Sequence, residues 1–114
     1  MKIVTGPLTV AELKSMAEAM YGNIVKAVVD IRRKVMAIDA ELHSDEEGML
    51  LENGSHQEDL WGINLLPDFD REDPDFLEFD AMINLRPSQG NLSRGVEDPE
   101  MQRMISSVVN EWIV

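Results

Sequence analysis

Apolar residues recur at helical spacing near both ends of the chain. Thr9, with Glu12 three residues later, has the spacing of a capping box, and Gly22 predicts where this first helix ends. Near the other end, Asp98 as the N-cap and Pro99 at the first helical position predict a C-terminal helix. The apolar stripe predicted for the first helix is Val10, Leu13, Met16, Ala17 and Met20. The stripe predicted for the C-terminal helix is Met101, Met104, Ile105, Val108 and Trp112.

The pattern changes between Asn23 and Leu42. Residues 24–31 are dense in β-branched side chains, and residues 35–42 alternate between apolar and polar positions. The alanine, lysine and arginine content would also permit one long helix from Thr9 to Leu42. The Val28-Val29 pair and the preceding glycine favour a strand, a turn and a second strand. We therefore predict a hairpin here.

The second half repeats this order. Ser44 to Glu47 has the spacing of a second capping box, and it predicts a short helix ending at Asn53-Gly54. Residues 60–66 predict a strand with Trp61, Ile63 and Leu65 on one face. Residues 76–85 alternate most regularly, so we expect one long strand. Its inward residues are predicted as Leu77, Phe79, Ala81, Ile83 and Leu85, and its outward residues as Glu78, Asp80, Met82 and Asn84.

These elements predict a fold class. The 114 residues fit one domain, so we expect a single α+β domain over residues 1–114. The expected order is α-ββ-α-ββ-α, with an antiparallel four-stranded sheet and helices packed on one face. Residues 2–4 add a possible short edge strand, and Trp61 and Trp112 are expected to be core residues.

Charge and composition narrow the classes of function. The net charge is −12, and residues 37–80 contain fifteen acids and a single base, Arg71. A phosphate backbone would be repelled by such a surface, so we expect no nucleic-acid partner. The chain has no cysteine, which excludes disulfides, thiolate metal sites and a cysteine nucleophile. It also shows neither a signal peptide nor eighteen consecutive apolar residues, so a cytoplasmic protein without a membrane partner is expected.

Several segments carry a resemblance to a known family. They are Glu41-Leu42-His43 with Asp45, Leu50 to Ser55, Gln57 to Asn64, and Ile83 to Asn91 followed by Glu97-Asp98-Pro99. In this order they resemble a family of short prokaryotic proteins described only as a domain of unknown function. The resemblance supports the hairpin, because related sequences look even more strand-like there. It implies no activity and no catalytic residue.

One polar cluster has the residue types of a metal site. Residues at alternate positions of a strand project from one face, and an imidazole with carboxylates suits a divalent cation or a general base. The predicted metal ligands are Asp39, Glu41, His43 and Asp45. His56 would be a further ligand if the helix folds back towards them. The alternative is a surface histidine beside an acidic first helical turn.

A second cluster follows the last predicted strand. A glycine-containing turn with two arginines can present converging donors to an anion or to a partner's carboxylate. The predicted ligand-binding or partner-binding residues are Arg86, Ser88, Gln89, Asn91, Ser93 and Arg94. The alternative is internal, with the arginines paired to nearby acids and the amides holding the loop backbone.

Residues 68–79 do not form a calcium loop, since Asp73 and Phe79 stand where an EF-hand needs glycine and glutamate. Two hypotheses of different classes remain. The leading one is a non-catalytic interaction or small-ligand-binding domain, expected to be a homodimer, without a required cofactor. The alternative is a metal-dependent hydrolase that uses the histidine and carboxylate cluster, so the sequence leaves open whether the protein is an enzyme.

Overall fold

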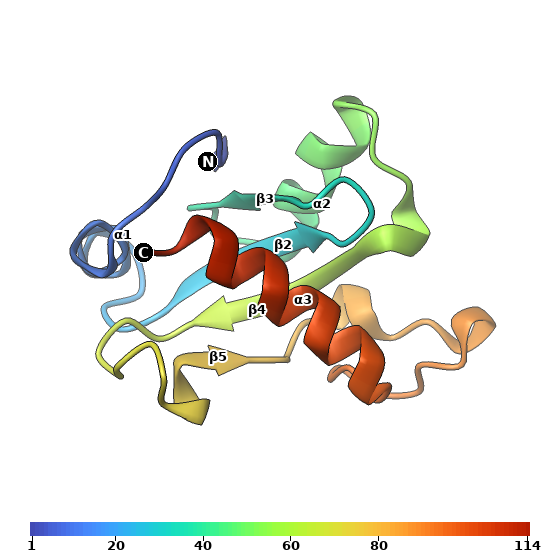
Figure 1. Cartoon of the computed structure of the whole chain (residues 1–114). Helices are drawn as coiled ribbons and strands as arrows, with labels where there is room; N and C mark the ends of the chain where they lie inside the picture. Colours follow the sequence, from blue (N-terminus) through green and yellow to red (C-terminus); the bar gives the residue numbers. More distant parts are fainter.

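A five-stranded antiparallel sheet organises the molecule (Figure 1). The computed structural model describes residues 1–114, and its strands lie in the order β1-β3-β2-β4-β5. The strands are β1 (Lys2–Ile3), β2 (Val25–Asp30), β3 (Val35–Ile38), β4 (Leu60–Leu65) and β5 (Leu77–Glu78). The helices are α1 (Val10–Ala19), α2 (His43–Glu52) and α3 (Pro99–Trp112). No helix combines the length and the apolar character needed to cross a membrane.

The predicted hairpin is confirmed. β2 and β3 pair antiparallel, with Val28 opposite Ala37 and Asp30 opposite Val35. Asp30 is fully buried at the turn, where its Oδ1 accepts hydrogen bonds of 2.9 Å from the backbone N–H groups of Arg32 and Arg33. The β-branched residues therefore form strands rather than a continuation of α1.

The helices near the two ends of the chain, α1 and α3, begin at the predicted residues. The Thr9–Glu12 capping box is present at α1, and Gly22 has a φ of 96°, which glycine adopts readily after a helix. Asp98 accepts a hydrogen bond from the backbone N–H of Glu100, and Pro99 is the first residue of α3. Local chemistry alone therefore determines where these two helices start.

The two faces of the sheet are both covered, by different elements. Odd-numbered residues of β2 and β4, such as Ala27 and Ile63, belong to the larger core with α1 and α3. Val28 and Leu60 project to the opposite face, where they pack with Ala37 of β3 and with Leu50 of α2. Figure 1 shows α3 crossing the near face of the sheet and α2 behind it.

Two parts of the predicted architecture are therefore wrong. The sheet has five strands instead of the four counted in the expected order, because the short edge strand considered for residues 2–4 does form: residues 2–3 pair with Ala37 and Ile38 of β3. The helices also do not share one face, because Leu50 anchors α2 on the face opposite α1 and α3. The central strands are apolar on both sides, and a strand buried on both faces needs cover on both.

The long strand predicted over residues 76–85 is also wrong. β5 ends at Glu78, and residues 82–84 form a 3₁₀ turn. Asn84, predicted to point outward, is fully buried, whereas Leu85, predicted inward, is 43% exposed. The 3₁₀ turn ends the alternation, so the pattern describes burial correctly only as far as Ile83, which packs against the smaller core cluster. The chain from residue 79 to residue 97 instead forms a long segment, here called the cover loop.

The start of α2 differs from its prediction as well. Leu42 is the N-cap residue and makes no side-chain cap, so the expected capping box at Ser44 does not form. Glu46 folds back instead, and its Oε2 accepts a hydrogen bond of 3.2 Å from the backbone N–H of Ala40. The helix ends as predicted, at Asn53 with Gly54 at a φ of 99°.

The cover loop lies directly on β4 at Gly62. A Cβ placed on Gly62 would overlap the Cβ of Ala81 and would lie 3.2 Å from Cγ1 of Ile83. The carboxamide of Asn84 pairs with the same residue: Gly62 N–H donates to Oδ1 at 2.8 Å, and Nδ2 donates to the Gly62 carbonyl at 2.9 Å. This exchange is the one that a residue of a neighbouring antiparallel strand would make.

Gly62→Ala is predicted to lower the free energy of unfolding by about 1–3 kcal/mol, the usual effect of overfilling a packed core. Gly48→Ala is the matched control, because a Cβ at that helical position meets nothing within 4 Å. That control should gain roughly 0.5–1 kcal/mol from the better helix propensity of alanine. Urea unfolding of the two variants measures both effects, and an unchanged Gly62→Ala midpoint would contradict the close approach.

Candidate functional site

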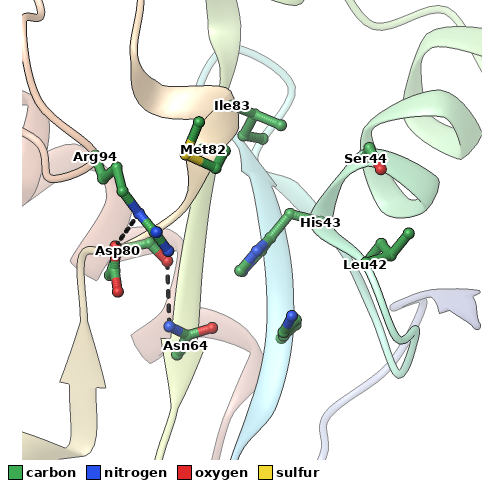
Figure 2. A pocket seen from close by; sticks show the side chains of 9 residues that line it. Leu42, His43, Ser44, Asn64, Asp80, Met82, Ile83 and Arg94 are labelled. Carbon is green, nitrogen blue, oxygen red and sulfur yellow. Dashed lines mark hydrogen bonds and ion pairs between the residues drawn. The ribbon is translucent and has the colours of Figure 1, made fainter.

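A pocket of about 210 Å³ opens between α2, the sheet and the cover loop. Figure 2 shows His43, Asn64, Asp80 and Arg94, from these three elements, around the centre of the pocket, with the other labelled side chains at its periphery. It is lined by Lys26 of β2, Leu42, His43 and Ser44 at the start of α2, Asn64 of β4, and Asp80, Met82, Ile83 and Arg94 of the cover loop. The pocket thus combines polar groups from the sheet with residues from both neighbouring segments.

Asn64 provides a buried acceptor at the floor of the pocket. The residue is only 5% exposed, and its Nδ2 donates to Glu78 Oε1 at 2.8 Å and to the Asp80 carbonyl at 3.1 Å. These two acceptors determine the orientation of the amide, because a flipped carboxamide would bring oxygen against oxygen. Oδ1 is left without a hydrogen-bond partner, and Figure 2 shows it on the side that faces His43.

His43 provides a second acceptor. Its Nε2 lies 2.8 Å from the carbonyl oxygen of Ile63, so Nε2 carries the hydrogen and donates it. Burial lowers the pKa of His43 in spite of this hydrogen bond, which acts in the opposite direction. The imidazole is therefore neutral at pH 7, and Nδ1 keeps a lone pair.

Lys26 is a cation without a carboxylate partner. It stands directly opposite Asn64 in the pairing of β2 with β4, and none of the four ion pairs of the protein involves it. Its Nζ lies 4.9 Å from the centre of the Tyr21 ring, and the Tyr21 hydroxyl donates to the Glu41 carbonyl at 2.6 Å. The ring of Tyr21, which does not itself line the pocket, thus contacts the ammonium group of this lining residue.

Arg94 and Asp80 form the wall on the side of the cover loop. Arg94 Nε donates to Asp80 Oδ1 at 2.8 Å, as the dashed line in Figure 2 shows. The backbone of Arg94 is tied to the loop, since its carbonyl accepts hydrogen bonds of 3.0 Å from Ala81 N–H and from Asn84 Nδ2. The ion pair leaves the terminal guanidinium nitrogens of Arg94 without a carboxylate partner.

Two of the exposed lining residues are apolar. Leu42 is 52% exposed and Met82 is 62% exposed, and both line the pocket. Three of the nine lining residues are apolar and the other six are polar or charged, so the pocket is more polar than most small-molecule sites and suits a small polar ligand.

The residues predicted in the arginine-containing turn are not all at this pocket. Only Arg94 lines it. Arg86 donates to the carbonyls of Ile83, Gln57 and Leu60, and its guanidinium lies 4.5 Å from the centre of the Trp61 ring. Burial lowers the pKa of Arg86. Its donors are therefore directed at the protein's own backbone.

The amides and hydroxyls of the turn also make internal contacts. Asn91 is buried, and its Nδ2 donates to the carbonyls of Asn84, Ser93 and Gly95. Gln89 accepts from Arg86 at 3.0 Å and donates to the Glu58 carbonyl at 3.2 Å. The Ser93 hydroxyl accepts from the Gly95 N–H, and Ser88 is exposed. These contacts hold the cover loop in shape.

The predicted metal ligands are dispersed. His43 lines the pocket, but Asp39 lies in a turn with a φ of 67°, and Glu41 and Asp45 are exposed outside the pocket. His56 lies on the surface, where its Nδ1 is 3.8 Å from Oε1 of Glu58. No three histidine, aspartate or glutamate side chains of the chain come together in a group that could hold a metal ion. The predicted set therefore does not fit a metal site in this arrangement.

A comparison with protein families matches residues 2–112, nearly the whole chain, to the model described as "Protein of unknown function (DUF5674)". The chain belongs to this family. The expectation of a family without a known function is thereby confirmed. No curated protein and no solved structure matches the chain. DUF5674 membership therefore assigns no ligand, and the pocket has to be interpreted from its own chemistry.

Sequence reasoning missed Lys26, Asn64 and Asp80 in this DUF5674 chain. Lys26 and Asn64 are polar residues on the central strands, where neighbouring positions are apolar. Such interruptions were the available signal, because a buried polar group needs a partner. The register between β2 and β4 decides that Lys26 and Asn64 lie opposite each other, and this register cannot be inferred from the local sequence of either strand.

Beside the pocket, Glu46 is a fully buried carboxyl group. Burial raises the pKa of Glu46 to about 9, partly offset by its hydrogen bond from Ala40 N–H. The side chain is therefore a neutral acid at pH 7. It holds the connection from β3 to α2, which carries Leu42 and His43.

Arg86→Ala is predicted to lower the free energy of unfolding by about 2–3 kcal/mol, because several backbone carbonyls lose a charged donor. Arg94→Ala should change it by less than about 1 kcal/mol, because its ion pair is half exposed. Chemical denaturation of the two variants tests the difference. Equal losses would contradict the division between a structural and a pocket arginine.

Glu46→Gln is predicted to flatten the dependence of stability on pH. Between about 4.5 and about 9 the native state keeps a proton that the unfolded state releases. Wild-type stability should therefore fall as pH rises through this window, by up to about 1.4 kcal/mol for each pH unit. Between pH 5 and pH 8 the free energy of unfolding of the wild type should therefore fall relative to that of Glu46→Gln, and the difference between the two should grow as the pH rises. Glu52→Gln, at an exposed site in the same helix, is the control, and parallel curves for wild type and Glu46→Gln would refute the raised pKa.

Proposed function

We propose that this protein is a small-ligand-binding domain whose site is the pocket between α2, the sheet and the cover loop. The observation that carries the proposal is the Asn64 carboxamide. Its oxygen is buried, its orientation is set by two hydrogen bonds on the nitrogen side, and it accepts no hydrogen bond while His43, whose charged form would donate to the Asn64 side chain, is neutral. A buried polar atom without a partner costs roughly 1–3 kcal/mol, and a ligand that donates to it recovers this cost.

The surrounding groups support the same proposal. Lys26 carries a charge without a carboxylate partner, and neutral His43 offers an acceptor at the same pocket. The exposed Leu42 and Met82 give the ligand an apolar contact on entry. These polar groups and the exposed apolar side chains together can orient a small polar ligand without requiring a reaction.

The remaining expectations belong to this proposal. We propose a cytoplasmic protein that acts without nucleic acid and forms a homodimer, and equilibrium sedimentation would measure the dimer. The alternative of a metal-dependent hydrolase gains no support, since Asp39, Glu41 and Asp45 do not meet His43.

A screen of small polar compounds by NMR tests ligand binding. We expect some compounds to shift the backbone amide signals of His43, Asn64 and Arg94 in the ¹⁵N-labelled protein. Asn64→Leu and Lys26→Met should weaken these compounds at least tenfold. The matched controls are Asn110→Leu and Lys14→Met, at exposed positions of α3 and α1, and these should not change binding. Compounds that bind all four variants equally, or a screen that never shifts the pocket signals, would reject the site.

A further inference from the structure

The charge of the pocket points to an anionic group on the ligand. Among the lining residues Arg94 is paired with Asp80, and His43 is neutral. The carboxylate of Glu78 next to Asn64 accepts from the Asn64 amide, so Lys26 is the lining cation without an ion pair. The chain has 22 acidic residues, and none of them forms an ion pair with Lys26. The unpaired ammonium group beside the opening therefore suits a carboxylate brought by the ligand.

The acceptors of the pocket point to a hydrogen-bond donor next to that anion. Lys26 and Asn64 are directly opposite each other on neighbouring strands and on the same face. Such pairs have Cβ atoms about 4.5–5.5 Å apart. A ligand whose donor and anionic group are on neighbouring atoms can reach both side chains, since the long lysine side chain can turn its ammonium group towards the Asn64 side. His43 adds a second acceptor at the same place, because its Nε2 hydrogen is taken by Ile63.

The volume of the pocket and its apolar lining residues indicate the size and polarity of the remaining part of the ligand. A volume of about 210 Å³ lies below the range of roughly 300–1,000 Å³ for sites that bind drug-sized molecules. Leu42, Met82 and Ile83 provide apolar surface at this pocket. A branched substituent of a few carbon atoms matches both observations.

We infer that the ligand is a small α-amino or α-hydroxy acid with an apolar side chain. Its carboxylate is held by Lys26, its N–H or O–H donor is bound by Asn64 Oδ1, and its side chain packs against Leu42 and Met82. This inference rests on the proposed function, because it names the ligand class of the same pocket.

Four probes with one carbon skeleton test the inference by isothermal titration calorimetry on the intact protein. L-leucine and 2-hydroxy-4-methylpentanoate carry both groups, 4-methylpentanoate lacks the donor, and 3-methylbutylamine lacks the carboxylate. We expect at least one of the first two to bind at least tenfold more tightly than either of the others. In Asn64→Leu the advantage over 4-methylpentanoate should disappear, and in Lys26→Met the advantage over 3-methylbutylamine should disappear.

Each other result overturns the inference. Equal affinity for 4-methylpentanoate would show that Asn64 does not recognise a donor, and preference for the amine would show that Lys26 does not hold a carboxylate. Failure of all four probes would also reject this ligand class. The proposed function has a separate outcome, because compounds from the NMR screen would still shift the pocket signals and depend on Asn64. Urea unfolding of both variants checks that they fold, with Asn110→Leu and Lys14→Met as controls.

Discussion

The carboxamide of Asn84 meets the backbone of Gly62 where β5 has ended, and the position of the cover loop follows from that contact. A side-chain amide carries the same donor and acceptor as a peptide group, so it can complete the edge of β4 without a further strand. Asn91 then holds the loop's own carbonyls together. Met82, Ile83 and Arg94 reach the pocket because this loop is anchored so closely to the sheet.

Much of the fold could be predicted from local sequence, and the failures share a cause. The ends of α1 and α3 depend on residues within one helical turn, and Thr9, Asp98 and Pro99 define them correctly. The alternation over residues 76–85 was misleading because buried positions in an irregular segment can mimic a strand. Asn84 is buried by a partner in β4, twenty-two residues away in the chain. The opposite placement of α2 likewise depends on tertiary packing of Leu50.

The candidate site was predictable only in part. His43 and Arg94 were recognised as chemically active residue types, each in a separate cluster, and the structure brings these two to one pocket. The other members of those clusters lie elsewhere, because alternation along a strand does not continue into the turn at Asp39 or into α2. Lys26 and Asn64 escaped notice because their meeting is a consequence of strand register.

That register links the pocket to the core. Along β2 and β4 the even positions hold Lys26 and Asn64, while the odd positions place Ala27 and Ile63 among the helices on the other face. A slip of one residue in either strand would exchange these sets and bury an ammonium group or a carboxamide against α3. The hydrophobic core therefore enforces the strand register that builds the pocket. Any pairing of β2 and β4 that misplaces Lys26 or Asn64 also disrupts the core packing that keeps the chain folded.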